Sequence, residues 1–221
     1  MPRKTGRTFA VIGLGNFGST VATELARFGN YVIGIDRDEA AASRLADKIG
    51  QAVIVDGKDE VALRDVGLAE CDAALVAMGE GLESSVLTVM NLRLIGVGQI
   101  WAKAVSRTHH RILSKLGVDR VVHPEEEIGR HMAQVLNNPM VRDYVSLGNG
   151  FHIVNLRVPQ GLAGRTLADL DLGRKFDLRA IGLMRGSDWL GGPETGSELA
   201  TDDKLLLLGN RSNLRAFADS I

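Results

Sequence analysis

Short apolar segments alternate with amphipathic segments through the first two thirds of the chain. The apolar segments are typical of strands covered on both faces, and the segments between them carry apolar residues at helical spacing. Strands are predicted at Thr8–Ile12, Tyr31–Ile35, Ala52–Val55, Ala73–Ala77, Ile100–Val105 and Val118–His123, and helices at Phe17–Phe28, Asp38–Ile49, Lys58–Val66, Leu82–Ile95, Thr108–Leu116 and Pro124–Leu136. This alternation predicts an α/β fold, a Rossmann-like doubly wound parallel sheet with right-handed crossovers.

The last third of the chain has a different pattern. Asn137-Asn138-Pro139 interrupts the helical spacing, and Gly148-Asn149-Gly150 is typical of a linker. Beyond it, strands are predicted at Phe151–Val158, Leu178–Met184 and Lys204–Leu208, helices at Leu167–Leu172 and Arg211–Ala218, and a loop or hairpin at Gly186–Gly196. We therefore expect a Rossmann domain at residues 1–123, a crossover helix and connection at 124–147, and a small α+β domain at 148–221.

The composition narrows the class of protein. The 26 Lys and Arg residues balance 27 Asp and Glu, so the net charge of −1 gives no electrostatic reason to expect nucleic acid or an anionic membrane as a partner. The single Cys71 excludes an internal disulfide and suits a reducing compartment. No apolar run reaches the ~18 residues of a membrane span, and the first residues lack the apolar core of a signal peptide. We expect a soluble, cytoplasmic protein.

A glycine-rich loop follows the first predicted strand and opens the first predicted helix. In this GxGxxG pattern, Gly13 permits a tight turn, Gly15 lets a phosphate approach the backbone, and Gly18 allows the helix to pack closely on the sheet. The free N–H groups at the helix N-terminus favour an anion. Asp36, at the end of the second strand, is placed to accept hydrogen bonds from ribose hydroxyls. The motif predicts a nucleotide and leaves NAD, ATP, ADP and AMP open.

No catalytic constellation accompanies this loop. The histidines show no metal-ligand spacing and no evident acidic or nucleophilic companion; they are His109, His110, His123, His131 and His152. His109 and His110 are expected on a solvated helix face, and Cys71 is expected to be a small residue near the surface. A ligand-binding role is therefore favoured over an enzymatic one.

Five segments carry a resemblance to a known family. They are Phe9–Gly18, Val32–Asp36, Ile100–Ala104, Leu116–Glu125 and Asp202–Gly209. Together they resemble the RCK proteins, whose domains regulate the conductance of potassium, and most of all the cytosolic regulatory subunits of the Ktr and Trk bacterial potassium-uptake systems. The resemblance covers essentially the whole chain.

The resemblance implies a regulatory role without enzymatic activity. A nucleotide-binding Rossmann half would be followed by a crossover helix that forms a homodimer, and then by a C-terminal half that dimerises and can bind a second ligand. Four dimers would form an octameric ring on a membrane-embedded potassium channel or transporter subunit, at the inner face of the cell membrane. ATP and ADP would favour different ring shapes.

The resemblance also implies a set of nucleotide-binding positions. They are Gly13, Gly15, Asn16, Phe17, Gly18, Asp36, Arg37, Asp56, Gly57, Lys58, Ala77, Met78, Gly79, Glu80 and Lys103. Ktr regulators commonly carry an arginine where this chain has Asn16, and an amide cannot match the charge-assisted contact of arginine to a distal phosphate. The preference among ATP, ADP and NAD(H) is therefore open. The alternative for Lys103 is a solvated lysine at the end of a strand.

Two further sites are implied by the resemblance. Glu125 would lie near the nucleotide of the partner subunit and help to hold Mg²⁺, Ca²⁺, Na⁺ or K⁺ at the phosphates; alternatively it is an acid favoured by the dipole of a helix N-terminus. In the C-terminal half, related regulators can bind cyclic di-AMP, and Arg174, Lys175 and Arg179 could meet its phosphates. A solvated basic turn is the alternative there.

Two other classes of protein are considered. A small NAD(P)-dependent oxidoreductase would need a proton donor or substrate clamp beyond the Rossmann core. A ligand-binding transcription regulator would need a basic recognition helix, and this balanced sequence offers none. The potassium-transport regulator is the interpretation that the motifs favour.

Overall fold

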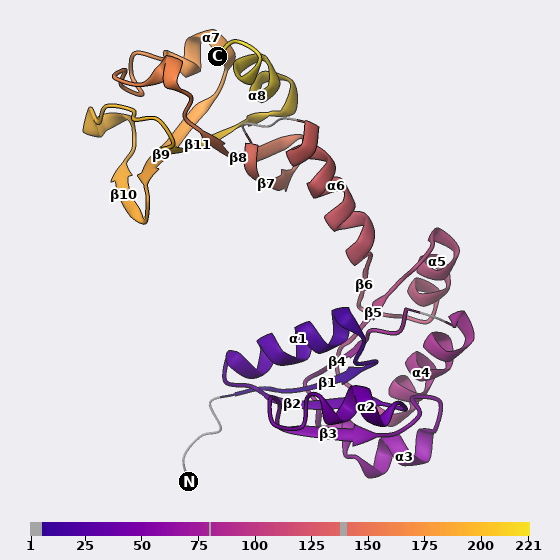
Figure 1. The fold of residues 1–221 in the computed structure, drawn as a ribbon. Coiled ribbons are helices and arrows are strands. Elements are labelled where there is room, and N and C mark those ends of the chain that lie inside the picture. Colours follow the sequence, from indigo (N-terminus) through magenta and orange to yellow (C-terminus); the bar gives the residue numbers. More distant parts are fainter. Residues whose placement is uncertain (1–5, 80, 138–140) are drawn as a thin grey trace. The chain divides into compact units, whose positions relative to one another are not determined.

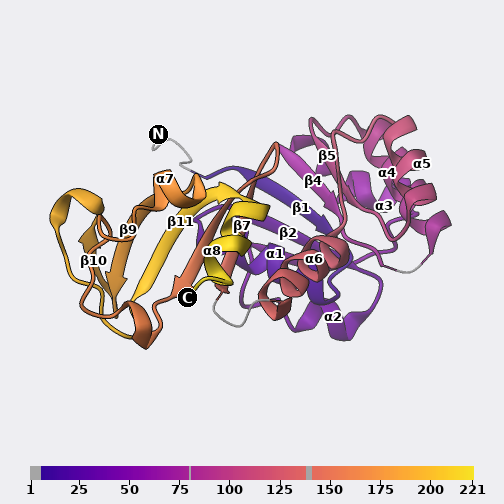
Figure 2. The same cartoon turned by 90° about the horizontal axis from the view of Figure 1, so that it is seen from above.

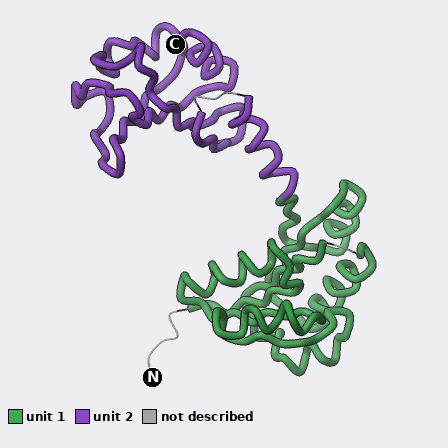
Figure 3. Tube along the Cα trace, viewed as in Figure 1, with its two compact units in different colours: residues 1–124 green, residues 125–221 purple. Residues whose placement is uncertain are grey.

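The computed structural model describes residues 6–79, 81–137 and 141–221 (Figure 1). The chain divides into two compact units, with the boundary between Pro124 and Glu125 (Figure 3). Each unit contains one sheet and buries its own apolar residues.

The first unit is built on a six-stranded parallel sheet with the order β3-β2-β1-β4-β5-β6 (Figure 2). Its strands are β1 (Thr8–Ile12), β2 (Tyr31–Asp36), β3 (Gln51–Ile54), β4 (Ala73–Val76), β5 (Ile100–Lys103) and β6 (Arg120–Val122). Its helices are α1 (Asn16–Arg27), α2 (Glu39–Ser43), α3 (Glu60–Asp65), the short 3₁₀ helix η1 (Leu68–Glu70), α4 (Leu82–Ile95) and α5 (Arg107–Lys115). The predicted Rossmann-like parallel sheet is confirmed.

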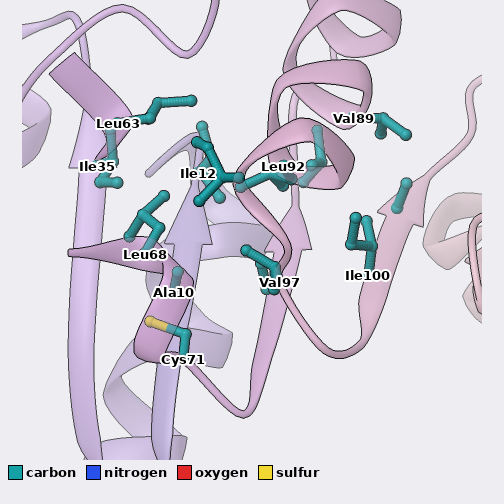
Figure 4. Close-up of a cluster of buried hydrophobic side chains, with 14 of the residues drawn as sticks. Ala10, Ile12, Ile35, Leu63, Leu68, Cys71, Val89, Leu92, Val97 and Ile100 are labelled. Carbon is teal, nitrogen blue, oxygen red and sulfur yellow. The ribbon is translucent and has the colours of Figure 1, made fainter. Parts of the chain in front are cut away.

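Both faces of this sheet are covered. On one face, α3, α4 and α5 contribute Leu63, Leu92 and Leu113 to a cluster with Ile12 and Ile100 (Figure 4). On the other face, α1 and α2 pack through small alanines against strands β1, β2 and β4. Burial on both faces explains why the strands are almost continuously apolar.

Side-chain caps fix where three helices begin. Asp38, Asp59 and Ser106 precede α2, α3 and α5, and each side chain accepts a hydrogen bond from a backbone N–H of the first turn. These caps satisfy donors that have no partner within the helix. Helix α2 ends at Ser43, and turns follow it through Lys48. The helix is therefore shorter than predicted.

The second unit is built on a five-stranded antiparallel sheet with the order β10-β9-β11-β8-β7. Its elements are α6 (Pro124–Asn137), β7 (Val141–Gly148), β8 (Phe151–Arg157), η2 (Gln160–Leu162), α7 (Leu172–Phe176), β9 (Arg179–Arg185), β10 (Asp188–Gly191), η3 (Pro193–Thr195), β11 (Lys204–Asn210) and α8 (Arg211–Ala218). Leucines of β8, β9 and β11 pack with Leu214 and Phe217 of α8 in one cluster. The small α+β character of this half is confirmed.

The interpretation of Gly148-Asn149-Gly150 as a linker is wrong. These residues turn β7 into β8, and all three have positive φ angles, which glycine and asparagine tolerate. Strand β7 therefore occupies the last residues of the expected connection at 124–147 and ends at Gly148. Two register shifts break its alternation of apolar and polar residues, which is why the pattern does not predict a strand.

The helix predicted at Leu167–Leu172 is also misplaced, since α7 begins at Leu172. The preceding residues form turns in which Thr166 and Asp169 bond each other: the Thr166 backbone N–H donates to Asp169 Oδ2, and the Asp169 N–H donates to Thr166 Oγ1. Asp171 and Asp177, with φ of 50° and 52°, bound the helix on either side. Local side-chain bonds here compete with helix formation.

The acidic pair before β11 has a structural role. Asp203 is 2% exposed and accepts hydrogen bonds from Arg185 Nε at 2.9 Å, Arg185 Nη2 at 2.8 Å and the Ala200 N–H at 2.8 Å. These bonds, led by that with Arg185, hold the pKa of Asp203 below its usual value. Asp203 therefore ties the start of β11 to the end of β9.

Candidate functional site

A cavity opens at the carboxyl ends of β1, β2 and β4. In the strand order, the chain runs from β1 outward to β2 and β3 and then returns to β4 on the other side of β1, so this is the point where the winding reverses. The cavity has a volume of about 340 Å³ and is lined by Ile12, Gly13, Gly15, Ile35, Asp36, Arg37, Val55, Asp56, Gly57, Ala77, Met78, Gly79 and Ser84.

The three loop glycines have different surroundings. Gly13 has φ +94°, and its N–H donates to the Ile35 carbonyl at 2.8 Å. A Cβ at Gly18 would collide with the Gly13 carbonyl oxygen and lie 3.0 Å from Ala77 Cβ. A Cβ at Gly15 would meet nothing within 4 Å. The protein itself therefore requires Gly13 and Gly18, whereas Gly15 leaves backbone open to the cavity.

Asp36 joins the end of β2 to the glycine loop. Its Oδ2 accepts from the Leu14 N–H at 2.7 Å, and its Oδ1 accepts from the Asp38 N–H at 3.0 Å. Each carboxylate oxygen has a second lone pair, so Asp36 can also accept from hydroxyls of a ligand in the cavity that it lines. The carboxylate both shapes the loop and offers acceptors to a ligand.

The loop after β3 is held against α4. Asn91 Nδ2 donates to the carbonyls of Gly57 at 3.2 Å and Lys58 at 2.9 Å, and Asp56 Oδ1 accepts from the Lys58 N–H at 3.0 Å. A Cβ at Gly57 would come within 2.6 Å of Thr88 Oγ1. This close packing brings the loop backbone to the cavity wall without a side chain at position 57.

Most of the expected nucleotide positions gather here. Nine of them line the cavity: Gly13, Gly15, Asp36, Arg37, Asp56, Gly57, Ala77, Met78 and Gly79. Lys103 is buried at the end of β5, with Nζ 3.6 Å from the point where a Cβ on Gly79 would lie. Asn16, Phe17, Gly18 and Lys58 flank the cavity along the chain without lining it. Glu80 lies outside the described residues.

Four lining residues are not among the expected positions. Ile12, Ile35 and Val55 lie at or next to strand ends, and they belong to apolar runs that give no separate signal for a ligand site. Ser84 lies in the first turn of α4, three residues after Gly81 with its φ of +88°. A glycine followed by a serine-containing helix start is the signal that could have identified it.

The other two implied sites are less assembled. Glu125 is exposed in the first turn of α6, and within the described residues no group of three or more His, Cys, Asp or Glu side chains is arranged to hold a metal ion. Arg174 Nε lies 3.0 Å from Asp171 Oδ2, and Arg179 is exposed on β9. Lys175 alone of the three basic residues lines a cavity among those described.

The expectation of a solvated His109 is wrong. His109 is 1% exposed, because it shares one face of α5 with Leu113, four residues on. The Val105 N–H donates to Nδ1 at 3.4 Å, so Nε2 carries the hydrogen of the neutral ring and donates to Ser85 Oγ at 3.2 Å. Burial, with a smaller effect of His123, lowers the pKa of His109 below its usual 6.5.

Cys71 is also buried, at 4% exposure, and not near the surface as expected. Burial, followed by the charges of Asp72 and Glu70, raises the pKa of its thiol to about 11. The sulfur packs with Leu68 and Ala10 in the cluster of Figure 4. It is therefore a neutral core residue.

Within the part of the chain that the structure describes, no helix is both long enough and apolar enough to cross a membrane.

The sequence matches two domain families. Residues 9–124 match the TrkA-N domain and residues 151–221 match the TrkA-C domain. The chain is 34% identical to the Ktr system potassium uptake protein C of Bacillus subtilis (strain 168) over 211 residues, which are 96% of each chain. It is 30% identical to the Ktr system potassium uptake protein A of the same organism over 217 residues, 98% of each chain.

The fold is similar to that of solved RCK structures. The RCK domain of GsuK matches 99% of this chain and 48% of its own length, with a TM-score of 0.66 and 18% identity. The GsuK channel solved with NAD matches 98% of this chain and 39% of its own, with a TM-score of 0.64 and 18% identity. At this level of identity the likeness concerns the fold.

Proposed function

The chain belongs to the family of proteins that join a TrkA-N domain to a TrkA-C domain, and from this we propose that it is the regulatory subunit of a Ktr-type potassium-uptake system. The observation that carries the proposal is the likeness to two Ktr potassium uptake proteins from end to end of each chain. The resemblance seen in the sequence motifs is confirmed at the level of the family. The expectation that the chain is not an enzyme agrees with the names of both relatives.

We propose that the cavity at the glycine loop binds an adenine nucleotide, with ATP, ADP and NAD(H) as the candidates. Gly15 would let the phosphates approach the N-terminus of α1, and Asp36 would accept from the ribose hydroxyls. Lys103, near Gly79, would supply a positive charge. The cavity volume of about 340 Å³ is of the size that holds a single nucleotide.

The regulation would depend on assembly. The proposed protein is cytoplasmic, forms homodimers that build an octameric ring, and docks on a membrane-embedded potassium channel or transporter subunit. Glu125 of one subunit would face the phosphates bound by another, which requires a cation between the two sets of negative oxygens. A nucleotide that binds one ring shape better than another would shift the ring toward that shape.

The second ligand stays a prediction. Cyclic di-AMP in the C-terminal half would meet Arg174, Lys175 and Arg179, which do not line one common cavity within the described residues of a single chain. The alternative function, a small NAD(P)-dependent oxidoreductase, has no supporting observation beyond the glycine loop.

Potassium flux in proteoliposomes tests the proposal. The membrane subunit of a Ktr system would be reconstituted alone and with the purified chain, each with ATP, with ADP and without nucleotide. We expect the chain to change the flux and the two nucleotides to differ in effect, with and without Mg²⁺. A flux that is the same with and without the chain in every condition would contradict the regulatory role.

Glu125→Gln sharpens the same experiment. The variant should keep ADP binding and lose any cation-dependent gain in ATP binding and flux. Glu127→Gln, also an exposed acid in the first turn of α6, is the matched control. A cation response of Glu125→Gln equal to that of wild type would show that Glu125 only favours the helix N-terminus.

A further inference from the structure

A second large cavity lies in the C-terminal unit, on the side of its sheet that carries α7 and α8. Its volume is about 430 Å³, and it is lined by Pro159, Gly161, Leu162, Arg165, Leu170, Lys175, Phe176, Phe217, Ser220 and Ile221. That volume is within the range of cavities that hold small organic molecules. All of these residues belong to one compact unit, so the cavity is complete within a single chain.

The walls of this cavity are apolar. Leu162, Leu170 and Phe217 are each 4% exposed or less and belong to the core of the unit. Phe176 meets Phe217 edge to face, with ring centroids 5.3 Å apart and an angle of 73° between the rings. A ligand here would rest on rigid apolar walls that the core already fixes, at little cost in side-chain ordering.

The charged side chains of the rim are both positive. Arg165 and Lys175 line the cavity, and no Asp or Glu side chain stands among its described lining residues. Arg165 Nη2 donates to the carbonyl of Asp169, and no carboxylate within the described residues forms an ion pair with Lys175. The rim is therefore electrostatically suited to an anion.

Nearby carboxylates are bonded to other groups. Asp171 pairs with Arg174 at 3.0 Å and Asp219 lies 3.6 Å from Arg215, while Asp169 Oδ2 accepts from the backbone and hydroxyl of Thr166. Arg174 and Arg215 thus pair with Asp171 and Asp219. Arg165 interacts electrostatically with Asp169, which does not line the cavity, so Lys175 is the lining cation without a carboxylate partner among the described residues. An apolar interior with convergent cations is the usual composition of a site for a small organic anion.

We propose that this cavity binds a small organic anion whose apolar body packs against Leu162, Leu170 and Phe217 and whose carboxylate or phosphate is held by Arg165 and Lys175. The site is separate from the glycine-loop cavity, because it lies wholly in the other compact unit. Of the three residues proposed for cyclic di-AMP, this cavity includes Lys175, whereas Arg174 and Arg179 do not line it.

Methyl NMR on the full-length chain tests this proposal. Leucine methyls would be labelled, the glycine-loop cavity would be saturated with ADP, and the protein would be titrated with benzoate, phenyl phosphate and the neutral benzyl alcohol. We expect benzoate or phenyl phosphate to shift the Leu162 and Leu170 methyls at lower concentration than benzyl alcohol. The stronger of the two anions identifies the anionic group that the site prefers.

Variants separate the two cations from general charge. Lys175→Gln and Arg165→Gln should each lower the affinity for the anion by about two- to fivefold, which is the scale of an exposed ion pair. Lys204→Gln removes the same charge from an exposed position of the same unit outside the cavity and should leave the affinity unchanged. The unliganded methyl spectra show directly whether each variant is folded.

Salt gives an independent readout in the wild-type protein, because exposed charge pairs are screened. Anion binding should weaken between 50 mM and 500 mM NaCl, and binding of benzyl alcohol should not. Equal binding of the anions and of benzyl alcohol, an equal effect of Lys204→Gln and Lys175→Gln, or shifts that avoid Leu162 and Leu170 would each overturn the proposal.

Discussion

Gly15 and Gly18 are glycines for different reasons. Gly18 faces the Gly13 carbonyl so closely that a β-carbon cannot fit, whereas a β-carbon on Gly15 would project into open space. The backbone of Gly15 is extended, with φ −65° and ψ −171°, a conformation that any residue adopts. Folding therefore explains Gly18 but does not require a glycine at position 15, where the proposed nucleotide would approach the backbone.

The same substitution should mainly lower stability at Gly18 and mainly weaken nucleotide binding at Gly15. Gly18→Ala should lower the free energy of unfolding by about 1–3 kcal/mol, because the added methyl overpacks the contact of α1 with the loop. Gly15→Ala should cost less than about 1 kcal/mol, the scale of a helix N-cap change, and should weaken nucleotide binding. Urea denaturation and calorimetry on both variants check this. Equal loss of stability in the two would contradict the distinct role of Gly15.

At the scale of the element, the sequence predicts most of the first unit and less of the second. The strands of the first unit are short apolar runs, and β1, β2, β4 and β5 are largely buried, so the strands and the helices between them are found. Strand β7 is missed, because two register shifts interrupt its alternation and its turn to β8 has the composition of a linker. Helix α7 is displaced, because bonds between Thr166 and Asp169 hold the preceding residues as turns.

The sequence also predicts some residues of the candidate site and misses others. The glycine loop and Asp36 are found because motif and strand end coincide, but Ser84 comes from a helix start with no motif of its own. The burial of His109 follows only from tertiary packing, since a histidine in α5 can face either solvent or α4. Its position beside Ser85 places it next to the first turn of α4, whose Ser84 lines the cavity.

The α4–α5 contact should make stability depend on pH. The pKa of His109 in the folded state lies below its usual 6.5, so below that pH the unfolded chain takes up a proton that the folded chain does not. The free energy of unfolding should therefore fall as the pH falls from about 7.5 toward 5.5, by at most about 1.4 kcal/mol per pH unit for one group. Chemical denaturation across that range measures it.

His109→Gln isolates the effect of this one histidine. Glutamine does not titrate, so the variant should show a flatter dependence on pH than wild type, whatever its stability at neutral pH. Thr108→Gln, at an exposed position of the same helix, introduces the same side chain without removing a titratable group and should keep the slope of the wild type. An unchanged slope in His109→Gln would mean that other groups cause the dependence.

At the scale of the whole molecule, helix α6 offers the clearest surface for self-association. Ile128, Met132 and Leu136 recur every four residues and are 61%, 46% and 77% exposed, whereas Val135 packs against the core of the second unit. An exposed apolar stripe of this kind is typical of a surface that another protein covers. The homodimer of the proposed function would cover it.

A single charge in this stripe should weaken the assembly. Met132→Glu would bury an unpaired carboxylate in the interface, so mass photometry should show a shift from dimers and larger assemblies toward single chains. Ala133→Glu, an exposed neighbour on a different side of α6, should keep the assembly of the wild type. Only single chains in the wild-type sample, with and without nucleotide, would contradict the proposed homodimer.

The proposed function depends on the binding of an adenine nucleotide in the glycine-loop cavity through Asp36. Calorimetric titration of ATP, ADP and NADH into the wild-type chain and into Asp36→Ala tests it most directly. Asp38→Ala is the control, since Asp38 caps α2 without lining the cavity. We predict binding of at least one nucleotide to wild type and a loss of about tenfold or more in Asp36→Ala, because hydrogen bonds to a charged acceptor contribute about 1.5–3 kcal/mol. Equal affinity in Asp36→Ala, or no binding of any of the three nucleotides by the wild-type chain, would contradict the proposed nucleotide site.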